Sequence, residues 1–329
     1  MLKEKKFTHL QASERERISI LTAEKKSKTQ IAKELGRSAS TITREFQRGV
    51  VHNGNYYALT TIENIRKVKF KVRRKRKTDN PEVQKYIIEK LKPPFLWSPE
   101  IISFKMKEEL GISIDKDSIY KFIYCNYELT RFLAKKHPGK MKREKKKNSE
   151  RTLIPNRTGI EERPVEANER KEFGHFEADT MVSKASLACL LVIADRMTRK
   201  VKIKKLVRKT AELTSSSILF ALQMYNVIQL LTITYDNGSE FCWHDRVNRE
   251  LNMKSFFCNP YSSWEKGTVE NINGLIRRFF PKKTDFDKIT EEEIQQVEDW
   301  INNRPMKILG YKSPNEKYQE LQKNMSVAI

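Results

Sequence analysis

The spacing of apolar positions divides the chain into a helical first part and a strand-rich second part. In residues 8–50, apolar side chains recur at helical spacing in three short runs. Gly36 ends the second run, and Ser38 stands where it would cap a third helix with Ile42 and Phe46 facing inward. Two short helices around a tight turn form a helix-turn-helix pattern, so we expect a three-helix unit here.

Residues 80–127 carry a second and weaker pattern of the same kind. Ser98 before Pro99 predicts the start of a helix, and Gly111 predicts its end. A following apolar run predicts another helix, whose aromatic residues we expect in the core rather than against nucleic-acid bases. These aromatic residues are Tyr120, Phe122 and Tyr124.

From residue 172 onward the pattern changes to short apolar runs typical of buried strands. A helical pattern over about 210–226 separates the third run from the fourth. Three strands, a helix and another strand indicate an α/β arrangement. The four predicted strands lie at residues 175–183, 186–194, 200–207 and 230–235.

A chain of 329 residues is long for one domain and suggests two or three. Breaker-rich basic stretches separate the patterned regions, which sets the expected boundaries. We expect a helix-turn-helix DNA-binding domain at 1–65, a basic linker at 66–79, a second helical DNA-binding domain at 80–134, a second basic linker at 135–168, and an α/β core with C-terminal helices at 169–329.

The charge of the chain favours a polyanionic partner. The sequence has 65 Lys and Arg against 42 Asp and Glu, a net charge of +23. Ribosome association or a solubility surplus would also give a positive charge, but few soluble enzymes need this much. Double-stranded DNA is the simplest partner, and the nine basic residues within 66–77 would contact phosphates without reading sequence.

The third helix of the N-terminal unit would enter the major groove if the motif binds DNA in the usual way. Its polar residues are then the candidates for base or phosphate contacts. These candidates are Arg37, Ser40, Thr41, Thr43, Arg44, Gln47 and Arg48.

The cysteines and the hydropathy exclude several other classes of protein. None of the four cysteines forms a Cys-x-x-Cys pair, so we expect a free thiol at Cys242 beside a surface His244 rather than a zinc site. No apolar run reaches the 18 or so residues of a membrane span, so we expect no membrane partner. The first seven residues are charged and lack the apolar core of a secretory signal, which favours the cytoplasm.

Three acidic residues stand in distinctive contexts. Asp179 lies in a predicted strand, Asp236 follows the fourth strand in an Asp-Asn-Gly turn signal, and Glu270 opens a helical pattern. Each alone has an ordinary structural explanation as a turn, capping or exposed residue. Carboxylates are the hard oxygen ligands that Mg²⁺ or Mn²⁺ prefers, and two such ions can support phosphodiester chemistry.

The segments around these acids are the most specific part of the sequence. Together with the N-terminal region, they resemble a transposase of the insertion-sequence-thirty family, in the group that uses an Asp-Asp-Glu triad. The resemblance covers nearly the whole chain. The matching segments are Asp236-Asn237-Gly238-Ser239-Glu240-Phe241, Asn259-Pro260-Tyr261, Trp264 to Lys282, Asn302-Asn303-Arg304-Pro305 and Leu309-Gly310-Tyr311-Lys312-Ser313-Pro314.

The resemblance implies a multidomain protein, in which an all-α helix-turn-helix region precedes an α/β ribonuclease-H-like core with a mixed five-stranded sheet. It implies that Asp179, Asp236 and Glu270 are catalytic and hold two Mg²⁺ ions, with Mn²⁺ as a substitute. One departure is that Phe176 and Ala178 stand where the family usually has Trp and Gly.

Four further residues lie near these acids along the chain. Arg277 follows Glu270 by seven residues, on the same helix face, where it would hold a phosphate. Period two puts Glu177 on the face of Asp179, as an auxiliary acid or a structural residue. Trp264 would stack on an unpaired base or anchor a loop, and we interpret Asp195 as a turn residue.

The expected function is therefore cleavage and transfer of DNA strands at the terminal inverted repeats of an element, into target DNA, by a homodimer or larger assembly. The alternative is a catalytically inactive, transposase-derived repressor, which would not need all three acids. A retroviral-type integrase would carry a His-His-Cys-Cys zinc module, a spacing that is missing here. A ribonuclease acting on hybrids would not need two recognition units.

Overall fold

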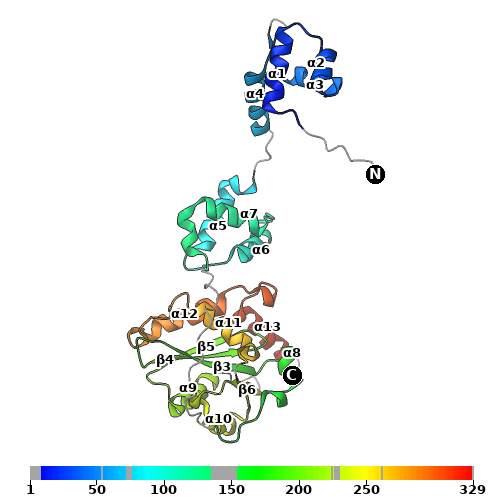
Figure 1. The fold of residues 1–329 in the computed structure, drawn as a ribbon. Helices are drawn as coiled ribbons and strands as arrows, with labels where there is room; N and C mark the ends of the chain where they lie inside the picture. Colours follow the sequence, from blue (N-terminus) through cyan, green and yellow to red (C-terminus); the bar gives the residue numbers. More distant parts are fainter. Residues whose placement is uncertain are drawn as a thin grey trace. The chain divides into compact units, whose positions relative to one another are not determined.

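The computed structural model describes residues 9–52, 55–71, 76–134, 154–223, 225, 230–260 and 262–327. The chain divides into two compact units, residues 1–76 and 77–329 (Figure 1). The first unit has one hydrophobic core, and the second has separate cores in its helical region and on the two faces of its sheet. Within the described ranges, no helix has the length and apolar character needed to cross a membrane.

The first unit contains the three predicted helices, followed by a hairpin and a longer helix that the apolar pattern did not predict. Ser27 Oγ accepts from Gln30 N at 3.3 Å and Ser38 Oγ accepts from Thr41 N at 3.2 Å, which caps the second and third helices. The elements are α1 (Ala12–Ala23), α2 (Lys28–Glu34), α3 (Ala39–Arg48), β1 (Val50–His52), β2 (Asn55–Tyr57) and α4 (Ala58–Lys71).

A buried carboxylate holds the first unit together. Glu45 on α3 accepts hydrogen bonds from Arg15 Nε at 2.6 Å and from the Tyr56 hydroxyl at 2.7 Å. Ile42 is fully buried and Phe46 is partly buried against this core, which confirms the predicted inward face of α3. Because Glu45 joins α1, α3 and the hairpin, the outward face of α3 is held on a rigid support.

The second unit begins with a helical region whose predicted helix limits are confirmed. Ser98 Oγ accepts from Ile101 N at 3.4 Å with Pro99 at the first position, and Gly111 ends the helix with a positive φ of 67°. Tyr124 was wrongly expected in the core: it is 63% exposed and stacks on Tyr120 along the outer face of its helix. The elements are η1 (Lys77–Asp79), α5 (Pro81–Leu91), α6 (Pro99–Leu110), α7 (Lys116–Cys125) and η2 (Tyr127–Phe132).

This helical region is bound to the rest of the second unit through backbone carbonyls. The carbonyl oxygen of Leu96 accepts from Arg304 Nη1 at 2.7 Å and from Arg278 Nη1 at 3.3 Å. Trp300 Nε1 donates to the Phe95 carbonyl at 2.9 Å. The helical and α/β regions therefore share one compact unit, and the domain limits expected within it stay a prediction.

A mixed five-stranded sheet forms the centre of the second unit and confirms the ribonuclease-H-like α/β core. The strand order is β5-β4-β3-β6-β7, antiparallel across β5, β4 and β3 and parallel across β3, β6 and β7. The apolar pattern located the first four strands but not the fifth. The strands are β3 (His175–Val182), β4 (Cys189–Asp195), β5 (Val201–Leu206), β6 (Thr232–Tyr235) and β7 (Lys254–Phe257).

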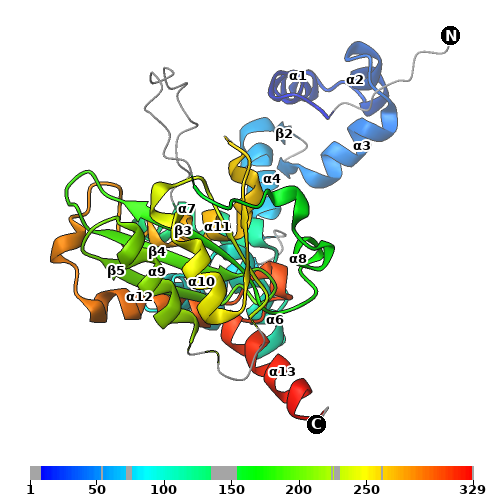
Figure 2. The same cartoon turned by 90° about the horizontal axis from the view of Figure 1, so that it is seen from below.

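Helices cover both faces of this sheet. One face packs against α9 (Ala211–Leu222) and α10 (His244–Leu251), which lie in front of the sheet when it is seen from below (Figure 2). The other packs against α11 (Gly267–Ile276) and α12 (Glu291–Asn303). Phe176 and Ala178 face the first core, whereas Met181 faces the second, as alternation along β3 requires.

The C-terminal helices also cover the exposed edge of the sheet. On α12, the buried Glu298 accepts from Ile203 N at 2.8 Å, and Asn302 exchanges two 2.9 Å hydrogen bonds with the backbone of Val201. These bonds pair the outer side of β5, which would otherwise be an open edge. The remaining elements are η4 (Ser239–Phe241), η5 (Ser263–Lys266), η6 (Phe286–Lys288), η7 (Lys307–Leu309) and α13 (Pro314–Val327).

Both predicted linkers overlap folded segments. Residues 66–71 of the first linker lie in α4. Residues 135–153 of the second linker lie outside the described residues, but 154–168 pack on the sheet through η3 (Ile160–Glu162) and α8 (Val165–Glu169). Thr158 O accepts from Phe257 N at 3.0 Å, which ties this segment to β7.

Candidate active site

The strand register places two of the three predicted acids side by side. Strands β3 and β6 are parallel, with His175 opposite Thr232 and Glu177 opposite Thr234. The same offset of 57 residues sets Asp179 level with Asp236, which directly follows the last residue of β6. Neighbouring strands lie about 4.8 Å apart, so the two carboxylates are close neighbours at this end of the sheet.

A lysine joins the two carboxylates. Lys266 Nζ lies 3.1 Å from Asp179 Oδ1 and 3.5 Å from Asp236 Oδ2, and it donates a further hydrogen bond to the Ala178 carbonyl at 3.1 Å. The lysine side chain is 8% exposed, against 25% for Asp179 and 46% for Asp236. The sequence predicts no role for Lys266, which is marked there only by its place in the segment Trp264 to Lys282.

The electrostatics of the acidic pair reflect burial and mutual repulsion. Burial raises the pKa of Asp179 above its ordinary value; the charge of Asp236 raises it further, while Lys266 opposes the shift. Burial alone would lower the pKa of Lys266, but the two carboxylates together raise it. A cation beside Asp179 therefore favours the charged form of its carboxylate.

The third predicted acid lies on the helix face that adjoins this pair. Lys266 precedes α11 and Asn273 lies near its end, and Asn273 Nδ2 donates to Asp179 Oδ2 at 2.7 Å. Glu270 is three residues before Asn273, so these two side chains share one face of the helix. Glu270 itself is exposed, and no cluster of three or more metal-ligating side chains occurs within the described ranges.

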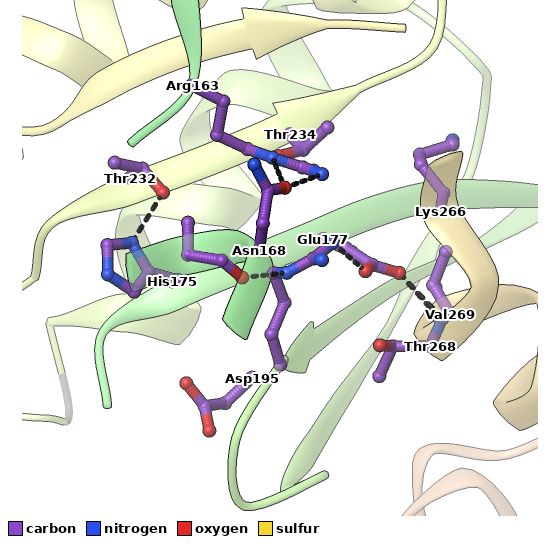
Figure 3. A network of polar contacts seen from close by, with 12 residues as sticks. Arg163, Asn168, His175, Glu177, Asp195, Thr232, Thr234, Lys266, Thr268 and Val269 are labelled. Atoms are coloured by element: carbon purple, nitrogen blue, oxygen red, sulfur yellow. Dashed lines mark hydrogen bonds and ion pairs between the residues drawn. The ribbon is translucent and has the colours of Figure 1, made fainter. Parts of the chain in front are cut away.

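Glu177 holds α11 in this position. Its fully buried carboxylate accepts from Thr268 N and Val269 N, both at 2.9 Å, at the start of the helix (Figure 3). The other carboxylate oxygen accepts from Arg196, whose Nε also donates to the Ala167 carbonyl at 2.8 Å. A carboxylate at a helix N-terminus is favoured by the unpaired N–H groups and the helix dipole, so Glu177 is an anchor rather than an exposed auxiliary acid.

Asp195 and His244 are structural residues. Asp195 is a buried turn residue, as predicted, and accepts from Gly174 N, Met197 N and Thr198 N. Burial raises its pKa to about 6. His244 was expected at the surface but is buried, because its Nε2 bonds the Pro155 carbonyl at 2.9 Å and its ring packs edge-on against Phe257.

Two other predicted residues occupy different settings. Arg277 Nη2 donates to the Val182 carbonyl at 2.9 Å at the end of β3, so its guanidinium secures α11 in this structure. Trp264 is 74% exposed, in the turn just before Lys266. The phosphate contact of Arg277 and the base contact of Trp264 stay predictions.

Comparisons with known proteins give the family. A family model described as a helix-turn-helix domain matches residues 6–49. The transposase for insertion sequence element IS4351 from Bacteroides fragilis is 35% identical over 98% of each chain. The transposase for IS1086 from Cupriavidus metallidurans is 32% identical over 94% of each chain. The transposase InsI for IS30A from Escherichia coli K12 is 32% identical over 94% of this chain and 82% of its own.

The chain belongs to the IS30 family of insertion sequence transposases. Among solved structures, the catalytic core domain of BIV integrase aligns with a TM-score of 0.37 and 19% identity, covering 46% of this chain and 98% of that one.

The departure from the IS30-family pattern around the first acid lies away from the acidic pair. Phe176 and Ala178 are both buried in the core formed with α9 and α10. Asp179 points to the opposite face, where α11 lies. Phe176 and Ala178 therefore affect the packing between the sheet and α9 and α10. Their side chains lie on the face of β3 opposite to Asp179.

The predicted DNA-contact residues of α3 fall into two groups. Arg37 forms a two-pronged ion pair with Glu14, at 2.7 and 3.1 Å, and Thr43 Oγ1 donates to the Ala39 carbonyl at 2.9 Å, while Thr41 is half-buried. The other group is exposed and follows the outward face of the helix. Its members are Ser40, Arg44, Gln47 and Arg48.

Replacing Glu177 by Ala should lower the free energy of unfolding of the second unit by about 3 kcal/mol or more, because it leaves Arg196 buried without its carboxylate. All four tryptophans lie within residues 77–329, so urea unfolding followed by tryptophan fluorescence reports on this unit alone. Glu270→Ala, on the same helix but exposed, is the matched control and should change stability by less than about 0.5 kcal/mol. Equal losses in the two variants would contradict the anchoring role.

Proposed function

We propose that this protein is a DNA transposase that binds the terminal inverted repeats of its insertion sequence and catalyses metal-dependent strand cleavage and strand transfer. The observation that carries the proposal is the pair Asp179 and Asp236, which lie level on neighbouring strands. The buried ammonium of Lys266 forms ion pairs with both. Family membership supports the overall activity. Glu270 completes the proposed catalytic triad from the adjoining face of α11.

The residues present fit divalent metal ions. Their oxygen atoms are the hard donors that Mg²⁺ or Mn²⁺ prefers, and the two aspartates already hold a positive charge between them. We propose that Asp179, Asp236 and Glu270 hold two such ions. When bound, a pair of these ions activates an attacking oxygen and stabilises the leaving oxygen of a phosphodiester.

The chemistry requires no covalent intermediate on the protein. Water attacks a phosphodiester at the element end and releases a 3′-hydroxyl, which then attacks a phosphodiester of the target strand. Each step exchanges one P–O bond for another. Within this chain, Glu177 positions α11, and Asn273 orients Asp179 through the 2.7 Å hydrogen bond to Oδ2. Both ends must be held together, so we expect a homodimer or larger assembly on DNA, acting in the cytoplasm.

Specific recognition is assigned to the first unit. Residues 1–76 contain 20 Lys and Arg against 7 Asp and Glu, which accounts for thirteen of the net +23 charges. Residues 77–134 contain nine of each and are neutral, although we expected a second DNA-binding domain there. Because counterion release rewards each phosphate contact, the basic unit with the exposed face of α3 supplies most of the affinity for the element ends.

Arg44→Ala should weaken binding to the element's own ends by roughly 5- to 100-fold, because an exposed arginine on the recognition helix is placed to contact base edges or phosphates. Arg17→Ala removes one charge from α1, where the guanidinium pairs with Glu34, and is the matched control. Fluorescence anisotropy with labelled terminal repeats and with a scrambled duplex measures both effects. Equal weakening by the two variants would show that α3 does not read the repeat.

The catalytic proposal is tested on a labelled DNA that carries the element ends and a target. In Mg²⁺, the wild-type protein should cleave and join strands, and Asp236→Ala should lose roughly a hundredfold or more of this activity while still binding the ends. Asp287→Ala, an exposed acid of the same unit, is the control and should keep full activity. Specific binding by the wild type without cleavage, in Mg²⁺ or Mn²⁺, would instead identify an inactive, transposase-derived repressor.

A further inference from the structure

The ammonium group of Lys266 is unusually enclosed for a lysine. It is bonded to the Ala178 carbonyl at 3.1 Å and to Asp179 Oδ1 at 3.1 Å, with Asp236 Oδ2 at 3.5 Å. An ammonium group has three N–H donors, and here three oxygen atoms surround it. Burying a charge is costly unless it is paired and hydrogen-bonded, so this arrangement is a built cation site.

We propose that the ammonium of Lys266 takes the place of a metal ion between Asp179 and Asp236 when no metal is bound. A divalent ion that binds there displaces the ammonium. This inference rests on the proposed function, in which Asp179 and Asp236 hold the metal. It adds that metal binding is a competition with a residue of the chain itself. Lys266 is thus a positioning residue, whose effect on the reaction comes through the two aspartates.

The two cations exclude each other on electrostatic grounds. An ion in direct contact with the facing oxygens of Asp179 and Asp236 would lie within a few ångströms of the present ammonium position. Like charges at such a distance repel strongly in a partly buried site. The ammonium would also lose its contacts with the Asp179 and Asp236 carboxylates to the ion. It would then move away from the acidic pair.

The backbone around Lys266 allows the side chain to move without the helix. Glu177 fixes the amides of Thr268 and Val269, directly after Lys266, and these bonds do not involve the lysine. The side chain is a flexible chain of four carbons, so rotation about its bonds moves the ammonium without moving the helix. A phosphate oxygen of bound DNA is the anion that would receive it, which makes metal and DNA binding mutually reinforcing.

The first test is Mn²⁺ binding to the full-length protein, measured by calorimetry without DNA. Lys266→Met keeps an unbranched side chain that is one heavy atom shorter and removes its charge, so we expect its dissociation constant for Mn²⁺ to fall by roughly tenfold or more. Lys202→Met removes a lysine that pairs with the buried Glu298 at 2.8 Å, and this matched control should bind like the wild type. Asp236→Asn should lose most of the binding.

A second test uses the wild-type protein and does not depend on whether a variant folds. The ammonium of Lys266 is buried between the two aspartates, so acetylation by a water-soluble reagent without added metal should label it poorly. Adding Mn²⁺, or Ca²⁺, which also takes oxygen ligands, should increase the labelling of Lys266 severalfold, as followed by mass spectrometry. Lys202 serves as the internal reference, because its labelling should not change.

The outcomes separate the inference from the function on which it rests. Tighter Mn²⁺ binding by Lys266→Met together with metal-induced labelling of Lys266 supports displacement. A different result overturns displacement: Mn²⁺ binding depends on Asp236 but is unchanged or weaker in Lys266→Met, and the metal does not change the acetylation of Lys266. The proposed metal site is then still supported. Absence of any binding that depends on Asp236, even with DNA present, overturns both.

Discussion

The buried carboxylate of Glu177 is the contact on which the rest of the site depends. It joins the middle of β3 to the first amides of α11, and it does so in the interior, where Arg196 balances its charge. Because β3 carries Asp179 and α11 carries Glu270, this one carboxylate sets the distance between strand and helix. The positions of Lys266 and Asn273 relative to Asp179 follow from it.

The parts of the chain to which we assign recognition and catalysis differ in charge as well as in sequence position. The first unit concentrates the positive charge and presents an exposed helix face supported by the buried Glu45. The neutral helical region that follows is fixed to the core by carbonyl groups that accept from Arg278 and Arg304. Burial lowers the pKa of Arg304 to about 10, and it stays charged at neutral pH. Arg278 and Arg304 therefore hold the helical region against the part of the second unit that carries the acidic pair.

The apolar pattern predicted the local structure well, because helix caps and the alternation along a strand depend on residues that are close in the sequence. It predicted the caps at Ser38 and Ser98 and the first four strands of the core. The resemblance supplied the sheet topology, which periodicity alone does not determine. The three acids were selected as candidates from their sequence contexts, and the register of β3 and β6 explains why two of them lie side by side.

The contacts that the sequence did not reveal are all long-range. The ion pairs of Lys266 with Asp179 and Asp236, and the bonds from Asn302 to Val201, join residues about thirty to a hundred positions apart. Nothing in the local pattern distinguishes such a residue from a surface one. Tyr124 and His244 were misplaced for the same reason, since a helix face or a buried carbonyl partner is set by tertiary packing.

A crystal structure of the full-length protein grown with Mn²⁺, with anomalous scattering to locate the ion, would show whether the two aspartates bind the metal. We expect an anomalous peak in contact with the carboxylates of Asp179 and Asp236, with the Glu270 carboxylate turned toward the ions and the Lys266 ammonium moved out. A strongest peak away from these residues, or no peak in crystals saturated with Mn²⁺, would contradict it.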